Sequence, residues 1–395
     1  MVQEVGKIES ELGNGKVAQV LVVGNYCHDV LIQDDKIIGE SLGGASSFIS
    51  NVFDNLSIDS DYISKVGFEF AYYNSVTHKP ISSSSSMTTL FHAYFSSDGN
   101  QERTLRRIHA CDPISVSDLP NSSSRFDFGL AVGVGGEILP ETLQHMIDIC
   151  DVVFVDVQAL IRVFDSIDGT VKLVSLKESG FFHLLPRIGF LKASAEEALF
   201  VDIEEARKHC CVVVTDGKDG CRVYTKDDKL QISPFPAVQI DPTGAGDSFL
   251  GGLVAALIQG RPVSDAALLG NFFGSLTVAQ IGIPKFDLRL MQIVKDELHQ
   301  RRIICIDHCE RRDMEPEVNT SIEENLGFQE FLNSITEHLP THNSEEENPL
   351  GARHSPAKAS EKNNQYQINS HHKLTLVPVY KEAASVVDSQ LHDTT

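Results

Sequence analysis

The sequence predicts an α/β fold built around a mostly parallel central sheet, and two patterns lead to this prediction. Short apolar runs rich in β-branched residues are bounded by Gly, Asp or Asn, and they occupy residues 20–23, 130–134, 152–157 and 212–214. Longer stretches with helical spacing lie between them, and 140–150 is the clearest. Continuous apolar strands that alternate with helices are typical of a parallel sheet buried on both faces.

Two hairpins interrupt this alternation. Residues 88–95 and 102–108 flank a turn that contains Asp-Gly, which is a strong hairpin signal between alternating runs. A hairpin inserted early in an α/β chain can form a side sheet, so we expect a small β lid there. Residues 222–225 and 230–233 form the second hairpin, which we expect at an antiparallel edge of the main sheet.

The composition of the chain excludes several classes of protein. The chain has 395 residues, of which 42% are hydrophobic and 22% charged, enough for one large α/β domain or two smaller ones. The formal net charge is −22, so neither nucleic acid nor an anionic membrane surface is expected as a partner. No apolar run approaches the roughly 20 residues that span a bilayer, and the N-terminal segment contains acidic residues but no apolar core. These features, with cysteines placed mostly in apolar runs, predict a cytoplasmic protein.

Changes in composition along the chain predict three regions. Residues 1–16 form an N-terminal extension, and residues 17–305 form one α/β domain with its lid at about residues 87–109. Residues 306–395 form an acidic tail that is rich in Glu, Asn, Ser and His. Such a segment buries too little apolar surface to offset the entropy of ordering, so the tail is expected to be mostly disordered.

One part of the tail has a helical pattern. Ser321 and Glu324 have the spacing of a capping box, and five apolar residues approximate one face of a helix. These five are Ile322, Leu326, Phe331, Ile335 and Leu339. The pattern fits a helix that docks on the domain or on a partner. It also fits a helix formed only part of the time, which is the preferred interpretation.

The most informative segment is the string DPTGAGDSF at residues 241–249. It lies between an apolar stretch and a run with helical spacing, so Gly244, Ala245 and Gly246 open a helix. Small residues let the N–H groups of a first helical turn approach an anion, and the helix dipole favours that anion. Asp247 lies at the same helix start, where its carboxylate can accept a proton from an attacking hydroxyl. The alternative is a glycine-rich helix entry whose acidic residue only stabilises the dipole.

This string resembles the C-terminal motif of the PfkB, or ribokinase-like, carbohydrate kinases, and the similarity extends from about residue 17 to about residue 300. The resemblance implies a three-layer Rossmann-like domain with a mostly parallel sheet and a small β lid. It also implies that Asp247 is the catalytic base and that Gly244, Ala245 and Gly246 form the anion hole for the phosphates of ATP. ATP is then the co-substrate, and a polyol hydroxyl is the acceptor.

The substrate side of that family is represented by two stretches. Asp29 falls where the family has an aspartate that binds substrate hydroxyls, and a carboxylate can accept two such donors. Gly43 and Gly44 correspond to a Gly-Gly pair that leaves room for the substrate. A turn aspartate and an ordinary helix entry are the alternatives. Phe48 stands where the family usually has Asn, which weakens any assignment of ribose or fructose as the substrate.

The nucleotide side is represented by three stretches. Ser194 and Glu197 align with the Asn-x-x-Glu motif of the family, which organises Mg²⁺ and phosphates, although Ser replaces Asn. We therefore expect a phosphate contact from Ser194 and indirect Mg²⁺ binding by Glu197, against the alternative of an exposed Glu pair on a helix. The resemblance also places four residues at the ATP site, namely Thr215, Gly217, Gly220 and Asn271.

Several strings narrow the resemblance to the plant myo-inositol kinases within the family. They are VVGNYCHDVLI, LGGASSFISNV, ACDPI, AVGVGGEILPET and QALIRVFD. This similarity implies ATP-dependent phosphorylation of myo-inositol to inositol 3-phosphate, which neither spacing nor composition could single out. A kinase for another sugar or for a nucleoside remains an alternative, and so does a non-catalytic scaffold that retains the fold.

The lid carries two further expectations. Arg103, Arg106 and Arg107 lie on its second strand, where one of them could reach the active site and offset phosphate charge. Exposed strand arginines are the preferred alternative. A homodimer through the lid is a further arrangement that we consider.

Overall fold

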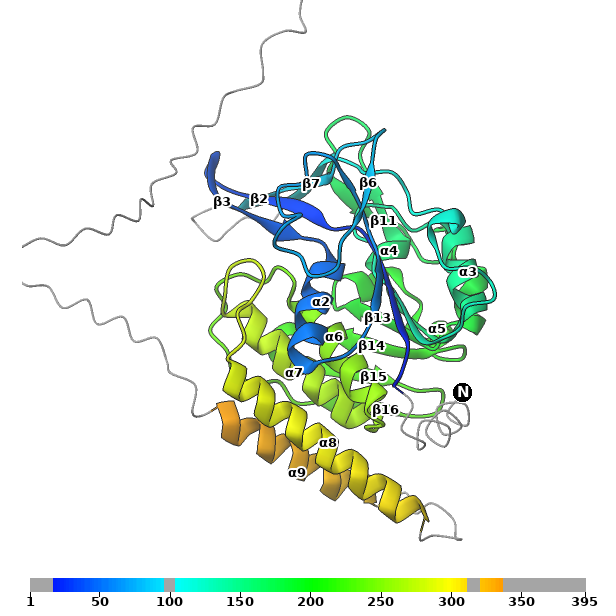
Figure 1. Cartoon of the computed structure of the whole chain (residues 1–395), viewed down its shortest axis with the longest axis vertical. Coiled ribbons are helices and arrows are strands. Elements are labelled where there is room, and N and C mark those ends of the chain that lie inside the picture. The colour runs from blue at the N-terminus through cyan, green and yellow to red at the C-terminus, as the bar shows by residue number, and fades with distance from the viewer. Residues whose placement is uncertain (1–16, 96–103, 311–319, 337–395) are drawn as a thin grey trace, which may run out of the picture. The chain divides into compact units, whose positions relative to one another are not determined.

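The computed structural model describes residues 17–95, 104–310 and 320–336 (Figure 1). The chain divides into two units, Met1–Pro340 and Thr341–Thr395, and all described residues belong to the first. Within this first unit a central sheet lies between two layers of helices, and a smaller sheet lies beside them (Figure 1).

The central sheet has eight strands in the order β16-β15-β14-β13-β10-β9-β1-β4. The strands from β14 to β4 pair in parallel, whereas β15 and β16 form an antiparallel edge. Their bounds are β1 (Val20–Val23), β4 (Asp61–Ile63), β9 (Phe126–Ala131), β10 (Cys150–Asp156), β13 (Phe190–Ser194), β14 (Cys211–Thr215), β15 (Cys221–Tyr224) and β16 (Lys229–Ile232). The predicted parallel sheet and its antiparallel edge hairpin are therefore confirmed.

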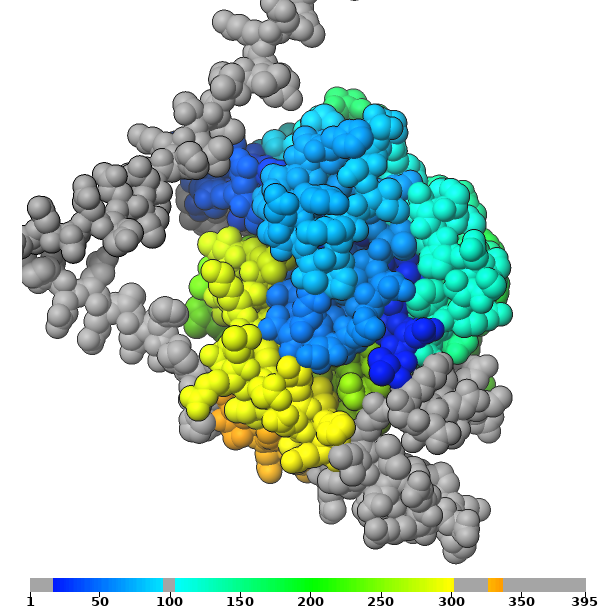
Figure 2. Space-filling model, viewed as in Figure 1, coloured from blue at the N-terminus to red at the C-terminus, as the bar shows by residue number. Residues whose placement is uncertain are grey.

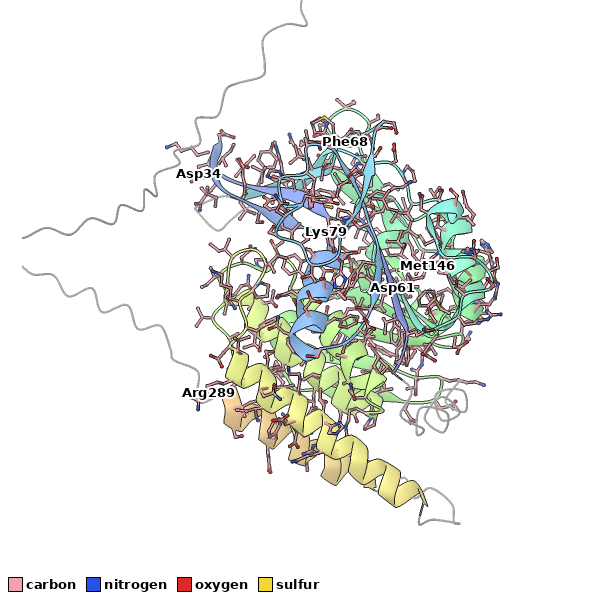
Figure 3. The ribbon with its side chains drawn as sticks, in the orientation of Figure 1. Asp34, Asp61, Phe68, Lys79, Met146 and Arg289 are labelled. Atoms are coloured by element: carbon pink, nitrogen blue, oxygen red, sulfur yellow. The ribbon has the colours of Figure 1, made fainter. Side chains whose placement is uncertain are left out.

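Helices cover both faces of this sheet, because successive side chains of a strand point to opposite sides. On β1, Val20 and Val22 belong to one apolar cluster, and Leu21 and Val23 belong to another. The first cluster includes α2 (Ala45–Leu56), α6 (Ala245–Ile258), α7 (Val263–Val278), α8 (Leu288–Glu310) and α9 (Thr320–Thr336). The second includes α3 (Pro140–Ile149), α4 (Gln158–Ile161) and α5 (Ile203–Ala206), with the buried Met146 of α3 labelled in Figure 3. This arrangement is the predicted three-layer architecture.

Shorter elements complete the connections. They are the 3₁₀ helices η1 (Val116–Asp118), η2 (Phe182–Arg187), η3 (Glu197–Phe200) and η4 (Gly217–Asp219), and the paired short strands β5 (Lys65–Gly67), β6 (Ile81–Ser83), β11 (Arg162–Phe164) and β12 (Val171–Leu173).

Helix α2 contacts α8, and the blue atoms of α2 border the yellow atoms of α8 on the face drawn in Figure 2. Within the described part of the chain, no helix combines the length and the apolar character needed to cross a membrane.

The lid is a sheet of four strands in the order β3-β2-β7-β8. The predicted hairpin is present as β7 (Thr89–Phe95) and β8 (Thr104–His109), which pair antiparallel. A second hairpin, β2 (Cys27–Gln33) and β3 (Lys36–Gly43), was not predicted. Its two-residue turn has positive φ angles of 47° at Asp34 and 62° at Asp35, at the hairpin tip labelled in Figure 3. Such turns usually contain Gly or Asn, so Asp-Asp gave a weak signal.

The end of the domain differs from the prediction. The boundary was expected at residue 305, with a mostly disordered tail beyond it, but α9 packs against α7 and the first unit continues to Pro340. Phe328 and Leu332 of α9 are fully buried in the main apolar cluster. The guanidinium groups of Arg261 and Arg301 lie over the ring of Phe328, at 5.9 and 5.1 Å from its centroid. The boundary at 305 is therefore wrong, because α9 belongs to the core.

The predicted apolar face of α9 is only partly right. Phe331 and Ile335 pack against the main cluster, but Leu326 is 53% exposed. The side chains of Ile322 and Leu339 lie outside the described residues. The observed face contains Phe328 and Leu332, which are spaced i, i+4 as a helix requires and are absent from the predicted stripe. The preference for a helix formed only part of the time is not supported by this burial.

Candidate active site

The candidate site lies where polar residues follow the carboxyl ends of neighbouring parallel strands. Strand β10 ends at Asp156, β13 ends at Ser194 and β14 ends at Thr215. The start of α6 approaches the same edge, since Gln158 contacts Asp247 and Lys192 contacts Gly246. Ligands of open α/β sheets bind outside the carboxyl ends of the strands, so this edge is the expected location of a site.

The loop before α6 holds the helix start open. Gly244 is the N-cap residue, has a left-handed φ of 75° and provides no side-chain cap. Oδ1 of Asp241 accepts hydrogen bonds from the Thr243 backbone N–H at 2.9 Å and from its hydroxyl at 2.6 Å, which fixes the loop. Because no side-chain oxygen caps the helix, its first turn can present N–H groups to an anion.

Asp247 is half-buried in the first turn of α6. Its Oδ1 accepts a hydrogen bond from Nε2 of Gln158 at 3.1 Å. Burial raises the pKa of the Asp247 carboxyl, and the positive charges of Lys192 and Arg162 oppose this shift. Burial therefore disfavours the charged carboxylate, and the neighbouring cations favour it.

A buried ion pair lies next to this carboxylate. Nζ of Lys192 is 2.9 Å from Oδ2 of Asp156, with side-chain exposures of 7% and 0%. Burial raises the pKa of Asp156 to about 6, although the ammonium of Lys192 opposes the shift. Burial alone would lower the pKa of Lys192, but Asp156, Glu197 and Asp247 reverse the effect and raise it, so the ammonium is charged at neutral pH.

Lys192 also contacts the start of α6. A Cβ atom placed on Gly246 would lie 2.8 Å from Nζ of Lys192. Glycine at this position therefore lets the ammonium approach the backbone of the first turn. The result is an ammonium group, paired with Asp156, beside the positive end of a helix, where it can contribute to binding an anionic ligand.

Ser194 and Glu197 hold each other in place. The backbone N–H of Ser194 donates to Oε2 of Glu197 at 2.8 Å, and the N–H of Glu197 donates to Oγ of Ser194 at 3.2 Å. Oε1 of Glu197 lies 3.9 Å from Nη2 of Arg162. Glu197 is buried and Glu196 is exposed, so the expected alternative of an exposed Glu pair is excluded.

The residues expected on the nucleotide side lie along the far edge of the sheet. Gly217 has a φ of 56°, and a Cβ atom there would meet nothing within 4 Å. Gly220 has a φ of 87°, and a Cβ atom there would lie 2.1 Å from the Ile232 carbonyl oxygen. Nδ2 of Asn271 donates to the Ser233 carbonyl oxygen at 2.8 Å, so this amide ties α7 to the end of β16. The Thr215 hydroxyl donates to the Ala193 carbonyl oxygen at 3.4 Å.

The residues expected on the substrate side meet where the lid joins the domain. Asp29 lies on β2, and a Cβ atom on Gly43 would lie 2.1 Å from its Oδ2. Gly44 is the N-cap of α2, with a left-handed φ of 87°, and a Cβ atom there would lie 2.4 Å from the Asn25 carbonyl oxygen. Both glycines are therefore required by close contacts, and the carboxylate of Asp29 rests on the first of them.

The lid arginines behave only partly as expected. The guanidinium of Arg107 lies 3.5 Å from the centroid of the Phe164 ring and donates to the Gly135 carbonyl oxygen. Arg106 pairs with Asp168 at 3.5 Å. The preference for exposed strand arginines is wrong for Arg107, which is half-buried, whereas the side chain of Arg106 is 40% exposed and fits it. Arg103 lies outside the described residues.

Sequence reasoning missed four residues of this cluster. They are Asp156, Gln158, Arg162 and Lys192. A usable signal existed for Asp156 and Gln158, because polar residues that end or closely follow an apolar parallel strand lie at the ligand-binding edge of such a sheet. Lys192 lies inside strand β13 and Arg162 begins β11, so this signal does not point to them. What the pattern could not show is which of these side chains meet one another.

The fold and this cluster define a class of protein, the small-molecule kinases of ribokinase-like fold. The profile of the "pfkB family carbohydrate kinase" matches residues 179–285. An inositol 3-kinase of Arabidopsis thaliana is 62% identical over 73% of this chain and 81% of its own length, and one of Oryza sativa subsp. japonica is 51% identical over 73% and 76%. The chain belongs to the PfkB family of carbohydrate kinases, and ATP is the co-substrate that this membership implies.

A solved structure supports the fold. A pyrophosphate-dependent kinase in the ribokinase family, complexed with a pyrophosphate analog and myo-inositol, superposes with a TM-score of 0.58. It is 16% identical to this chain, and the match covers 67% of this chain and 97% of that one. At this level of identity the similarity establishes the ribokinase-like architecture of the described domain.

Proposed function

We propose that this protein transfers the γ-phosphoryl group of ATP to a hydroxyl of myo-inositol and forms inositol 3-phosphate. The observation that carries the proposal is the position of Asp247 in the first turn of the uncapped helix α6, close to the ammonium of Lys192. The identity of the acceptor rests on the two plant inositol 3-kinases, which are similar over 73% of the chain.

In the proposed mechanism Asp247 is the catalytic base. Its carboxylate accepts the proton of the attacking hydroxyl, the hydroxyl oxygen bonds to the γ-phosphorus, and the bond to the bridging oxygen breaks to release ADP. Gln158 orients the carboxylate through its hydrogen bond to Oδ1. The cations of Lys192 and Arg162 oppose the effect of burial on the pKa of Asp247 and so favour the charged carboxylate that acts as the base.

The anion hole is proposed at residues Gly244, Ala245 and Gly246. The N–H groups of the first turn of α6 would hold the γ-phosphoryl oxygens, and the dipole of the helix would stabilise their charge. The ammonium of Lys192, which is paired with Asp156, lies at the same place. Preorganised charges of this kind act mainly on the transition state, in which negative charge shifts toward the leaving group.

The acceptor is proposed to lie between the lid and the start of α2. Asp29 is the acceptor of hydrogen bonds from substrate hydroxyls, and Gly43 and Gly44 keep side chains out of that space. The contact between the Asp29 carboxylate and Gly43 supports this assignment, because it orients the carboxylate at the junction of lid and domain. Strand β2 belongs to the lid, so the lid itself would carry the residue that binds the acceptor.

The residues on the nucleotide side of the site, away from the lid, are proposed to bind ATP. Ser194 would contact phosphate, and Thr215, Gly217 and Gly220 would form the loop beside the nucleotide. The absence of any atom within 4 Å of a Cβ placed on Gly217 supports an open surface at that loop. We assign Asn271 an indirect role, because its amide holds the end of β16 through Ser233.

Mg²⁺ fits this donor set as a partner of the nucleotide. No group of three or more His, Cys, Asp or Glu side chains in the described ranges could hold a metal by itself. Mg²⁺ usually keeps several waters and is held by substrate phosphates with one or two carboxylates. We propose that Glu197 is such a carboxylate and acts through water. When bound, the ion would neutralise part of the phosphate charge.

Two further assignments accompany the proposal. We place the protein in the cytoplasm, which the free thiols of Cys27, Cys111, Cys150 and Cys221 support, because a reducing compartment preserves them.

We also propose a homodimer through the lid. The exposed Ile37 and Ile38 on the edge strand β3 support it, and Ile37→Lys should then lower the molar mass measured by light scattering.

A substrate panel tests the proposed function. ADP release is measured with myo-inositol, ribose, fructose and adenosine as acceptors, and pyrophosphate is run in parallel as an alternative donor. We expect the highest kcat/KM with myo-inositol and ATP, and a product identified as inositol 3-phosphate by NMR. A clear preference for another acceptor would replace the substrate assignment, and failure to bind ATP with Mg²⁺ in calorimetry would favour a non-catalytic scaffold.

A further inference from the structure

Phe48 is a buried aromatic residue in an unusual place. It lies in the first turns of α2, and its side chain is 1% exposed. None of the three apolar clusters formed by the described residues includes it. Its position is therefore explained by a specific neighbour and not by packing within one of these clusters.

That neighbour is the N-cap residue of α6. A Cβ atom placed on Gly244 would lie 2.0 Å from Cε1, 2.2 Å from Cδ1 and 2.2 Å from Cζ of the Phe48 ring. The ring therefore rests directly on the backbone of Gly244, in the space that a side chain would fill. Gly244 holds a left-handed φ of 75°, and its carbonyl oxygen accepts the hydrogen bond from the Ser248 N–H at 2.8 Å that starts the helix.

The two helices run in the same direction along this contact. Further along, a Cβ atom on Gly251 of α6 would lie 3.1 Å from Cβ of Val52 of α2. Phe48 precedes Val52 and Gly244 precedes Gly251, so both helices start at the same end. Both N-caps are glycines with left-handed φ, at Gly44 and Gly244, and neither cap carries a side-chain hydrogen bond.

We propose that Phe48 is a positioning residue that fixes the first turn of α6 relative to the start of α2. The inference rests on the proposed function, in which α2 begins at the acceptor and α6 begins at the phosphates. The ring of Phe48 would fix the distance between the start of α2, where the acceptor binds, and the anion hole at the start of α6. In-line transfer depends on that distance, because a displacement of about 1 Å between reacting groups can cost about a hundredfold in rate.

A matched pair of variants tests this role. Phe48→Leu removes the ring contact with Gly244, and Val52→Ala removes a similar number of carbon atoms one turn further along, against Gly251. Both should lower the melting temperature. Only Phe48→Leu should lower kcat, by about tenfold or more, while KM for myo-inositol changes little.

A second measurement separates this inference from the proposed substrate. ATP affinity, measured by calorimetry without acceptor, should weaken in Phe48→Leu and not in Val52→Ala, because the anion hole itself is disturbed. This result would support the positioning role even if the panel identified a different acceptor. Equal losses of kcat and of ATP affinity in the two variants would overturn it, since Phe48 would then contribute only to stability.

Discussion

Gln158 and Asp247 are joined by a hydrogen bond of 3.1 Å, although they are 89 positions apart in the sequence. The bond connects the first residue of α4 to the first turn of α6, and it orients the carboxylate that we propose as the base. The positive charges of Lys192 and Arg162 lower the pKa of Asp247. The reactivity of this carboxylate therefore depends on residues from three separate parts of the sheet edge.

Asp247→Asn should abolish most of the activity while the fold is retained. An amide cannot accept the hydroxyl proton, and loss of a general base typically lowers kcat by about 10²- to 10⁴-fold. Burial disfavours the charged carboxylate, so the neutral variant should be at least as stable as the wild type. Steady-state kinetics and thermal unfolding check the two parts. A variant that keeps the wild-type kcat would show that Asp247 is not the base.

The activity should fall at acid pH, and Lys192 should set where it falls. Burial raises the pKa of Asp247, so the base becomes protonated, and kcat drops, at a higher pH than for an ordinary aspartate. Lys192 lowers that pKa, so Lys192→Met should move the acid limb of the kcat profile to still higher pH. Lys177→Met, at an exposed lysine, is the control. An unchanged acid limb in Lys192→Met would contradict the proposed coupling.

Glu197→Gln should weaken nucleotide binding more than it weakens the fold. The buried carboxylate holds the Ser194 N–H and lies near Arg162, and we propose that it supports Mg²⁺ through water. We expect a severalfold higher requirement for Mg²⁺ and a higher KM for ATP. Glu196→Gln changes the neighbouring, exposed residue and should behave like the wild type. Identical Mg²⁺ titrations of the two variants would argue against the role of Glu197.

Asp29→Asn should raise KM for the acceptor and leave KM for ATP nearly unchanged. A carboxylate forms charge-assisted hydrogen bonds with hydroxyls, and each is worth about 1.5–3 kcal/mol. Replacement by an amide should therefore weaken acceptor binding by about tenfold or more. Asp35→Asn, at the tip of the same hairpin, is the matched control. The acceptor assignment fails if both variants show the same KM for myo-inositol.

Phe328→Ala should destabilise the domain strongly. The ring is fully buried in the main cluster and contacts the guanidinium groups of Arg261 and Arg301. Removal of a buried Phe typically costs about 3–5 kcal/mol. Leu326→Ala, on the exposed side of the same helix, should cost less than about 0.5 kcal/mol. Urea denaturation of both variants checks this difference, and equal midpoints would mean that α9 does not belong to the cooperative unit.

The sequence alone was sufficient for the architecture and for the proposed base. Val20–Val23 is a parallel strand as predicted, and α6 begins at the Gly-Ala-Gly turn with Asp247 in its first turn. Both features follow from local patterns, because apolar runs and glycine-rich helix starts act within a few residues. The hairpin of β2 and β3 was missed because its turn has Asp34 and Asp35 where Gly or Asn is usual.

Only the tertiary structure decided which side chains meet. The buried pair of Lys192 and Asp156, the contact of Gln158 with Asp247 and the ring of Phe48 on Gly244 each join segments far apart in the chain. The docking of α9 through Phe328 is of the same kind. Such contacts depend on how the sheet brings the ends of its strands together, and no local pattern carries that information. The charges that set the pKa of Asp247 are therefore a property of the folded chain.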